Sequence, residues 1–392
     1  MSRFEKISLV TLIFIAIGLW TDIGLNFLSA HWHNPLGPVL SMPSQIPTRQ
    51  SNQPKINITN SLSLTQDLIF SPDNKYLSVR GTDQPALFNG PKSMTVLTIG
   101  SDTRAQTYLY GLADVIRYIR IDFVNPRISI LEFPRDLWVT IPGIETHYGI
   151  THGKLNQAYF YGNPGMGYYD GTGQGPGLLA STLDLNFGAH PDHYIAANMQ
   201  TFVHLVDSVG GIDIFLPFSV DARKPDQDKR KDLYFTAGQH HLSGEQALML
   251  ARIREYSVFA RADQQNRILC ALKKAVLSPY ILPNLPSIIN SFTNSVQTDL
   301  SPQQISEIAC LLPQIKSENI SFITFPRELL SEARTFDIGV QKDVYIFKAD
   351  FETLKLYVKA FDLGAWPDQQ SEVHSQATST PRPRGEGLYK CP

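Results

Sequence analysis

Several arginines stand where strands or helices are expected to end, and their side-chain chemistry suits a phosphate-bearing ligand. Arg135 is one of them: it lies in Pro134-Arg135-Asp136, directly after the apolar stretch 127–133. A guanidinium donates two hydrogen bonds at a fixed spacing, which matches the oxygens of phosphate. A surface turn with a local ion pair is the ordinary alternative for this tripeptide. If the basic side chains converge, they would hold a group with several negative charges, such as pyrophosphate: Arg104, Arg135, Lys154, Arg252, Arg254 and Arg261.

Two aspartates are placed to meet at one edge of a sheet. Asp102 follows the apolar stretch 94–100, and Asp114 begins the next one, 114–124. Loops at strand ends carry functional groups on a rigid frame. Two close carboxylates repel unless a cation or a proton lies between them. Mg²⁺ uses one or two carboxylates and completes its shell with water and phosphate oxygens, so the spacing allows a Mg²⁺ site. An N-cap or turn role for each aspartate is the alternative.

The basic residues of the later segment depend on helix geometry. Arg252 and Arg254 would point about 200° apart on a helix, so they can share a ligand only if the chain is extended there. Arg261 and Gln265 are four residues apart and would share one helix face. That face continues in an apolar stripe, Leu269, Leu272 and Val276. A polar head followed by an apolar stripe suits an anionic group joined to a hydrocarbon, and it also suits an ordinary amphipathic helix.

A sheet must position these residues, and the pattern of apolar residues predicts one. Strands are expected at 94–100, 114–124, 127–133 and 137–142, with Asn125-Pro126 as a turn between the second and third. Helices are expected at about 177–185 and 199–209, and Gly210-Gly211 ends the second and leads to a strand at 212–217. Ser243 and Gln246 fit a capping box, and a helix near 301–312 and a strand at 320–326 follow. The predicted fold class is α/β (α+β), with a mixed central sheet flanked by helices.

The two ends of the chain differ from this body. Arg3 and Lys6 precede an apolar stretch, 7–30, that is interrupted by Asp22. Residues 1–30 are interpreted as a transmembrane anchor with its N-terminus in the cytoplasm and the rest of the chain outside; a cleaved signal peptide is the alternative. Residues 31–90 are predicted to be a tether and 367–392 a disordered tail. The main domain is then 91–280, with 281–366 packed on it.

Charge and cysteine content limit the possible functions. The 392 residues carry a formal net charge of −2, which gives no overall electrostatic reason to bind nucleic acid. No Cys-x-x-Cys or histidine-rich spacing suggests zinc. Cys270 and Cys310 lie in apolar helical contexts and could be core residues or one bridge between packed helices. Cys391 lies in the predicted tail and is assigned no role.

Six motifs occur in the order seen in the LytR-CpsA-Psr family. They are TVLTIGSDTR, LADVI, ISILEFPRDLWVTIPG, HGKLNQAY, LVDSVGGIDI and LSGEQALMLARIR. The resemblance covers about residues 93–275 and continues weakly to about 360. It implies a membrane-anchored, outward-facing enzyme that takes a glycopolymer from a polyprenyl-pyrophosphate carrier. Such an enzyme joins the polymer to peptidoglycan or another envelope glycan, with Mg²⁺ as cofactor.

The resemblance also implies roles for single residues. Asp102 and Asp114 match metal-binding aspartates, and Arg135 matches a pyrophosphate-binding arginine. The remaining head-group contacts match Lys154, Arg252, Arg254, Arg261 and Gln265. The polyprenyl tail would occupy an apolar pocket between the sheet and the helices. The chain departs from the family at Leu112 and Gln264, where arginine is usual; Arg104 or Arg267 could restore the lost charge.

The resulting hypothesis is a phosphoryl transfer. Mg²⁺ on the two aspartates would neutralise the pyrophosphate, while Arg135, Arg252 and Arg254 stabilise the leaving polyprenyl phosphate. An acceptor sugar hydroxyl would attack the phosphorus and form a phosphodiester. Asp136 would act as the base or, with the better fit, orient an arginine. Two alternatives stay open: hydrolysis of a polyprenyl pyrophosphate, and a non-catalytic lipid-binding or regulatory role in the envelope.

Overall fold

A mixed sheet forms the centre of the molecule. The computed structural model describes residues 32–40, 69–70, 76–77, 86–103, 108–223, 230–253, 258–281, 288, 295–366 and 389–391. In spatial order the sheet strands are β13 (Val296–Thr298), β8 (His193–Asn198), β3 (Ser93–Ser101), β4 (Ala113–Asp122), β5 (Arg127–Glu132), β14 (Ile320–Thr324) and β17 (Tyr389–Lys390). β3 runs parallel to β8 and β5 runs parallel to β14, whereas the other neighbours are antiparallel. The predicted mixed sheet is therefore confirmed.

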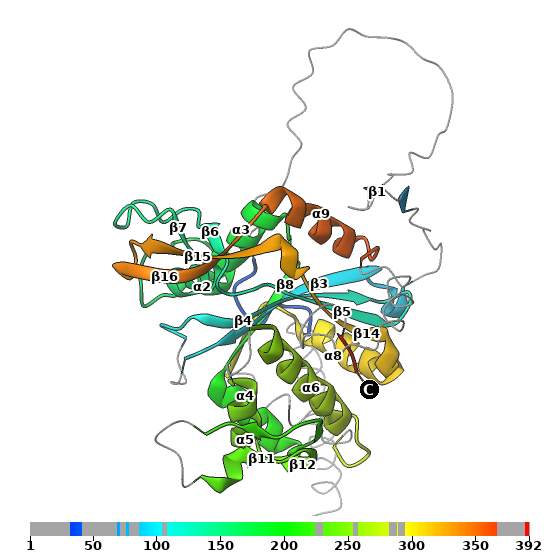
Figure 1. Ribbon diagram of the computed structural model, residues 1–392. Helices are drawn as coiled ribbons and strands as arrows, with labels where there is room; N and C mark the ends of the chain where they lie inside the picture. The colour runs from blue at the N-terminus through cyan, green and yellow to red at the C-terminus, as the bar shows by residue number, and fades with distance from the viewer. Residues whose placement is uncertain are drawn as a thin grey trace, which may run out of the picture.

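Helices cover both faces of this sheet (Figure 1). On one face lie α2 (Leu155–Gly162), α3 (Gln174–Phe187) and α9 (Phe351–Asp362). With them lie two small antiparallel sheets, β6 (Trp138–Thr140) with β7 (His152–Lys154) and β15 (Leu330–Asp337) with β16 (Lys342–Ala349). The core between these layers includes Phe133, whose ring packs edge-on against Phe187 and Phe325 at centroid distances of 4.9 and 5.4 Å.

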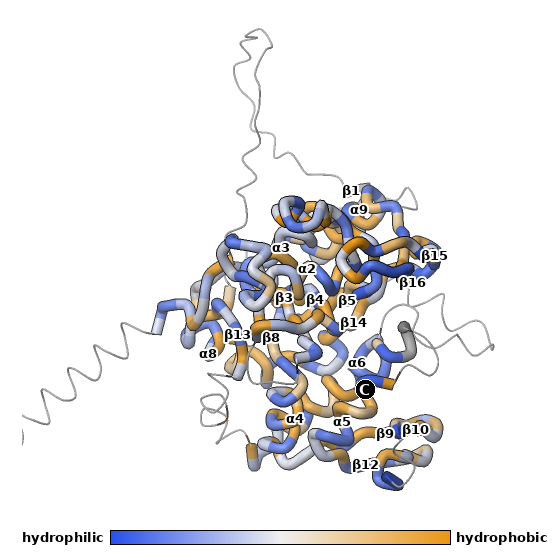
Figure 2. Tube along the Cα trace, turned by 90° about the vertical axis from the view of Figure 1, so that its left-hand side faces the viewer, coloured by the Kyte–Doolittle hydropathy of each residue, from blue (hydrophilic) through white to orange (hydrophobic). Residues whose placement is uncertain are grey.

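On the other face a lobe with its own small core packs below the sheet (Figures 1 and 2). It contains α4 (Met199–Ser208), α5 (Gly244–Ala251), α6 (Val258–Val276), β9 (Ile212–Leu216) paired with β12 (Gly238–Leu242), and β10 (Val220–Asp221) paired with β11 (Tyr234–Phe235). α8 (Pro302–Leu311) lies on the same side. The predicted capping box begins α5: Ser243 and Gln246 exchange side-chain and backbone hydrogen bonds, which satisfy two donors of the first turn.

The pattern of apolar residues predicted the positions of most strands but not which strands pair with one another. The stretches 94–100, 114–124 and 127–133 became β3, β4 and β5. The stretches 137–142 and 212–217 contain β6 and β9, which pair outside the central sheet. The short hairpin β1 (Ile69–Phe70) and β2 (Tyr76–Leu77) lies within the predicted tether.

The N-terminal part of the chain is only partly described. The predicted anchor, residues 1–30, lies outside the described residues, and none of the described helices combines the length and the apolar character needed to cross a membrane. Within the predicted tether, residues 32–40 lie against the body instead. Leu40 is buried in the core, and its backbone N–H donates to the carboxylate of Asp299 at 3.3 Å.

The C-terminal residues correct two expectations. Residues 389–391 do not belong to a disordered tail: β17 pairs with β14, and Tyr389 packs edge-on against Phe322 at 5.8 Å. Cys391 forms a disulfide with Cys270 of α6, whereas Cys310 is free and exposed. Of the two alternatives for Cys270 and Cys310, a bridge between them is therefore excluded, and Cys391, which was assigned no role, is the partner because β17 places it next to α6.

Removing this disulfide should lower the free energy of unfolding. The bond closes a loop across 121 residues, so Cys391→Ser should cost about 2–4 kcal/mol by freeing the unfolded chain. Chemical denaturation under non-reducing conditions measures the loss. Cys310→Ser is the matched control and should change stability little. Equal midpoints for all three proteins would contradict the expectation.

A second stability effect depends on pH. Burial raises the pKa of Asp362, at the end of α9, to about 6, against the opposing effects of Tyr118 and Arg120. The folded state therefore favours the protonated carboxyl, so its stabilising contribution is present below about pH 4 and is lost as pH rises through 6. Asp362→Asn should stabilise the fold by up to about 3 kcal/mol at pH 8 and by almost nothing at pH 3.5. Unfolding curves of both proteins at the two pH values measure the difference; a pH-independent gap would contradict it.

Candidate active site

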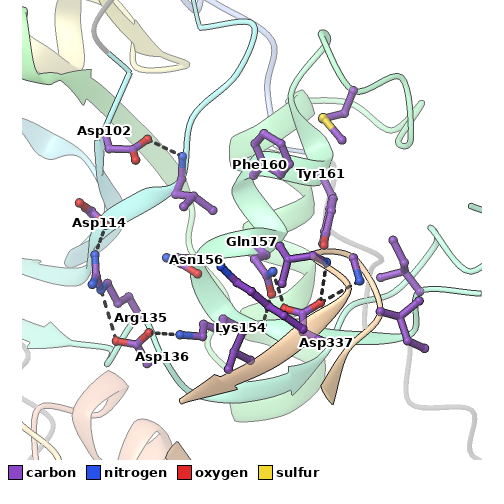
Figure 3. Close-up of a pocket in the computed structure, with 18 of the residues that line it drawn as sticks. Asp102, Asp114, Arg135, Asp136, Lys154, Asn156, Gln157, Phe160, Tyr161 and Asp337 are labelled. Carbon is purple, nitrogen blue, oxygen red and sulfur yellow. Dashed lines mark hydrogen bonds and ion pairs between the residues drawn. The ribbon is translucent and has the colours of Figure 1, made fainter. Parts of the chain in front are cut away.

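A polar cavity of about 940 Å³ opens beside the ends of β3 and β4. Its walls come from the turn after β5, from β7 and α2, and from the β15–β16 hairpin (Figure 3). Six of the predicted site residues line it: Asp102, Asp114, Arg135, Asp136, Lys154 and Arg252. Residues from distant segments of the chain are thus brought to one cavity.

Asp102 is fixed by the return of the chain from the loop between β3 and β4. Its backbone N–H donates to the Leu112 carbonyl at 3.0 Å, and its Oδ1 accepts from the Leu112 N–H at 2.7 Å. Gly111 has φ +139°, and a Cβ there would lie 2.1 Å from Thr103 Oγ1, so only glycine allows this close return. Leu112, one of the two departures from the usual family pattern, lines the cavity and holds Asp102 through its backbone.

A chain of alternating charges runs through the cavity (Figure 3). Arg135 forms a short ion pair with Asp114 and donates from Nε to Asp136 at 3.3 Å. Asp136 is buried and also accepts from Lys154 Nζ at 2.7 Å. The strand β5 therefore ends by presenting Arg135 between two acids, and Asp136 orients both cations. Both oxygens of the Asp136 carboxylate are engaged, one by Arg135 and one by Lys154, which favours an orienting role over that of a base.

An apolar cavity of about 950 Å³ lies behind the polar one, between the sheet and α4, α5 and α6. Its hydrocarbon lining includes Ile99, Val115, Phe202, Leu205, Leu248, Ile253, Ile268, Leu269 and Leu272. Asp114, Met199 and Arg252 line both cavities. A charged chamber and a hydrocarbon-lined chamber thus meet at these three side chains.

Arg261 and Gln265, on the face of α6 predicted to carry a polar head, line the apolar cavity beside Asp114. Arg261 is buried and donates from Nη2 to the Asp114 carbonyl at 3.2 Å. Gln265 Nε2 donates to the Ala251 carbonyl at 3.2 Å, which ties α6 to the end of α5. α5 ends at Ala251, and Arg252 is its C-cap, so Arg252 leaves the helix at this tie.

Sequence reasoning missed Arg117, a buried arginine on β4 that also lines the apolar cavity. Its side chain is 3% exposed, pairs with Glu132 of β5 at 3.0 Å and donates to Gln265 Oε1 at 3.4 Å. Burial lowers the pKa of Arg117, and the ion pair with Glu132 opposes that shift. The available signal was strand alternation, since Arg117 falls on the same face as Val115 in a strand whose neighbours are apolar.

The two arginines suggested as substitutes for the lost charges behave differently. Arg267 packs over the ring of Tyr389 at 5.8 Å and is not among the described residues that line either cavity. Arg104 lies outside the described residues, and so does Arg254. Gln264 is buried in α6. Of the arginines that the structure describes, Arg117 is the one that donates a hydrogen bond to Gln265 and could replace a charge lost at Leu112 or Gln264.

The β15–β16 hairpin is a second feature that sequence reasoning missed. Phe347 of β16 donates its N–H to the Asp136 carbonyl at 2.9 Å, which attaches the base of the hairpin beside the ion-pair chain. Near the tip, Asp337 is 1% exposed and accepts from Gln157 Nε2 of α2 at 2.7 Å. Asp337 also accepts from the Gly339 N–H at 2.8 Å, which closes the turn. The hairpin is thus anchored at both ends and forms one wall of the polar cavity.

No cluster of three or more histidine, cysteine or acidic side chains with metal-binding geometry occurs in the part of the chain that the structure describes. Asp102 and Asp114 therefore offer a pair of carboxylates rather than a complete protein ligand set. A pair is what Mg²⁺ uses when water and phosphate oxygens complete its shell.

Comparison with known proteins supports the family resemblance. The family model described as LytR_cpsA_psr matches residues 65–355. The polyisoprenyl-teichoic acid–peptidoglycan teichoic acid transferase TagV of Bacillus subtilis (strain 168) is 30% identical over 213 residues, covering 53% of this chain and 50% of TagV. The regulatory protein MsrR of Staphylococcus aureus (strain COL) is 25% identical over 280 residues, covering 70% of this chain and 77% of MsrR. The match thus spans half the length of one relative and about three quarters of the other.

The fold agrees as well. The crystal structure of B. subtilis TagV superposes with a TM-score of 0.53 at 23% identity, covering 70% of this chain and 99% of that chain. At this level of identity the superposition shows a shared fold alone. Because the family model extends over most of the chain and through every element that builds the two cavities, the protein belongs to the LytR_cpsA_psr family.

Proposed function

We propose that the protein transfers a glycopolymer from a polyprenyl-pyrophosphate carrier to peptidoglycan or another glycan of the cell envelope, through a phosphodiester. The observation that carries the proposal is the meeting of the polar and apolar cavities at Asp114, Met199 and Arg252. A polyprenyl pyrophosphate has the same division, with a charged head joined directly to a hydrocarbon. The named activity of TagV and the family membership agree with this substrate class.

The chain's own residues would bind and orient the reacting group. Arg135 and Lys154, held by Asp136, would donate to the pyrophosphate oxygens, and Arg252 would contact the oxygen nearest the hydrocarbon. A hydroxyl of the acceptor glycan attacks the phosphorus that carries the glycopolymer; the new O–P bond forms as the bond to the polyprenyl phosphate breaks. The hydroxyl proton is released and the leaving phosphate takes up the charge, which the arginines stabilise.

The charges of the polar cavity favour a bound Mg²⁺. Its described lining contains four acids, Asp102, Asp114, Asp136 and Asp337, and four bases, Arg135, Lys154, Arg252 and Lys342. These offset one another, so a pyrophosphate would add negative charge without enough compensation. Asp102 and Asp114 would hold the ion through oxygens, which are the ligands Mg²⁺ prefers. Bound there, Mg²⁺ would neutralise phosphate oxygens and stabilise the charge that develops on the leaving group.

We also propose that the protein is anchored in the cell membrane by residues 1–30, with the domain outside. The apolar stretch 7–30 supports the anchor, and the Cys270–Cys391 disulfide supports an oxidising compartment. A membrane-impermeant protease applied to wall-free cells should remove the domain; protection of the domain from the protease would contradict this location.

The transfer is tested with the purified full-length protein in detergent. It is mixed with a glycopolymer on polyprenyl pyrophosphate, Mg²⁺, and a peptidoglycan fragment as acceptor. Phosphodiester-linked product and polyprenyl phosphate should appear in equal amounts and only when the acceptor is present. Chelation of the metal should stop both.

The same assay separates two other functions. Release of polyprenyl phosphate without acceptor would show a hydrolase instead. Lipid binding without any turnover would show a non-catalytic role. The relative MsrR, which is named a regulatory protein, is the reason to test for this role. Loss of product on changing Asp102 to Ala would agree with either enzyme and exclude the non-catalytic role.

A further inference from the structure

The polar cavity has two distinct ends. At one end, Asp114 and Arg252 adjoin the apolar cavity. At the other end, four aromatic side chains line the wall, and none of them lines the apolar cavity: Tyr148, Phe160, Tyr161 and Tyr168, here called the aromatic wall. Figure 3 shows Asp102, Asp114 and Arg135 on one side, Phe160 and Tyr161 on the other, and Asn156 between them.

The aromatic wall is organised around Tyr168. The Tyr168 ring stacks on His147 at a centroid distance of 4.4 Å and an interplanar angle of 8°, and on Tyr161 at 5.9 Å and 17°. Tyr148 lies 6.2 Å from Tyr168 and is 79% exposed, so its ring is not part of the core. Tyr148 is thus the exposed ring of the wall. An exposed aromatic ring that lines a cavity offers an apolar face to a ligand, so the wall suits an occupant with an apolar face and a polar rim.

Asn156, on the first turn of α2, provides an independent sign of a ligand. It lines the polar cavity, is 5% exposed, and its side-chain oxygen has no hydrogen-bond partner among the described residues. Buried amide oxygens are nearly always satisfied, so an unpaired one on a residue that lines a cavity is a candidate acceptor for a ligand hydroxyl. Its own backbone N–H is fixed to the Arg135 carbonyl at 3.1 Å, which places it beside the ion-pair chain.

We propose that Asn156 and the aromatic wall bind the sugar that is bonded directly to the pyrophosphate of the lipid carrier. This inference rests on the proposed function, because it takes the direction of the substrate from the apolar cavity. With the hydrocarbon in that cavity and the pyrophosphate at Arg135, the next group of the substrate lies at the opposite end. A pyranose ring has C–H faces that pack on aromatic rings and a rim of hydroxyls that donate to an amide oxygen.

The Tyr161 hydroxyl and the tip of the β15–β16 hairpin would limit which sugars fit. The hairpin tip lies against Tyr161, since a Cβ on Gly339 would lie 1.9 Å from the Tyr161 hydroxyl. Burial raises the pKa of Tyr161 to about 12, so its hydroxyl remains a donor at neutral pH. Ile338, Gly339 and Val340 complete the lining there, so bulky substituents on the sugar would meet the hairpin.

Two lipids test the proposal: polyprenyl pyrophosphate without sugar, and the same lipid carrying one N-acetylhexosamine. Their dissociation constants are measured with the full-length protein in detergent. The sugar-bearing lipid should bind more tightly to the wild type, and Tyr148→Leu, Tyr168→Leu or Asn156→Ala should each remove about 3- to 10-fold of that preference. Affinity for the sugar-free lipid should stay within about twofold, because no contact to the head or the tail is lost.

Two control variants accompany this measurement. Tyr148→Phe keeps the ring and should keep the preference, and because Tyr148 is exposed its variants do not depend on core packing. Tyr280→Leu changes a tyrosine that is 86% exposed and is not among the lining residues, and should have no effect. Equal affinity of the wild type for both lipids, or equal weakening of both in the variants, overturns the sugar site and leaves the proposed function standing. Failure of the wild type to bind either lipid overturns the proposed function itself.

Discussion

Arg135→Ala should reduce the rate of glycopolymer transfer about 100- to 1,000-fold, the effect expected for loss of one donor aimed at developing charge. Arg135 is the central cation of the polar cavity: it lies between Asp114 and Asp136 and is 14% exposed. Removing it also leaves Asp114 without its partner, so the cavity would become more negative where phosphate must bind. The measurement is the initial rate of phosphodiester formation at saturating lipid.

Two control variants show whether the loss of rate is specific to the Arg135 guanidinium. Arg135→Lys keeps the charge but loses the two-pronged donor, so it should recover only part of the rate. Arg230→Ala removes a partly exposed arginine that lines neither cavity and should leave the rate unchanged. A rate for Arg135→Ala within threefold of the wild type would show that this arginine is not used in the reaction.

Glu132→Leu should destabilise the fold by about 3–5 kcal/mol, because it leaves Arg117 as a buried cation without its acid. The pair is a direct cross-strand contact between β4 and β5, with side chains 3% and 13% exposed. The guanidinium also packs over Phe322 at 5.6 Å, so it has little freedom to reach water. Denaturant unfolding measures the loss.

The double variant, Arg117→Met with Glu132→Leu, separates stability from positioning. Replacing both partners by apolar groups should restore most of the stability. It also releases Gln265, whose other hydrogen bond holds the end of α5 beside Arg252. The double variant should therefore fold normally yet bind the lipid less well. Full stability of the double variant together with unchanged lipid binding would show that Arg117 has no positioning role. A Glu132→Leu variant as stable as the wild type would show that the buried pair does not stabilise the fold.

An exposed ion pair is the control. Asp232→Asn should leave the free energy of unfolding almost unchanged, because Arg230 and Asp232 are solvated.

Much of the site could be predicted because its signals are local. Asp102 and Asp114 flank a loop between two strands with a clear β pattern, so strand pairing alone places them at one edge. Arg135 lies in the turn that follows β5, and Arg261 lies on the helix face that the spacing indicated. In each case one element and its end decide the position of the residue.

The remaining features depend on contacts between segments that spacing does not encode. The side chain of Gln265, which is predicted to contact the substrate, is also engaged by Arg117 and by the Ala251 carbonyl, and only the packed structure shows these two contacts. The partner of Cys270 lies 121 residues away, and three cysteines allow several pairings. The aromatic wall combines three segments with the hairpin tip nearby, and none of its residues has a distinctive spacing on its own.

The three side chains common to both cavities have one more consequence, for how substrate preference can evolve or be engineered. At Asp114, Met199 and Arg252 a substitution touches the head and the hydrocarbon together. Shortening the isoprenoid and neutralising Arg252 should then give non-additive losses in affinity, whereas shortening it in an Asn156 variant should give additive ones. Recognition of the carrier's length and of its pyrophosphate are thus coupled at the junction, whereas recognition of the sugar at Asn156 can change independently.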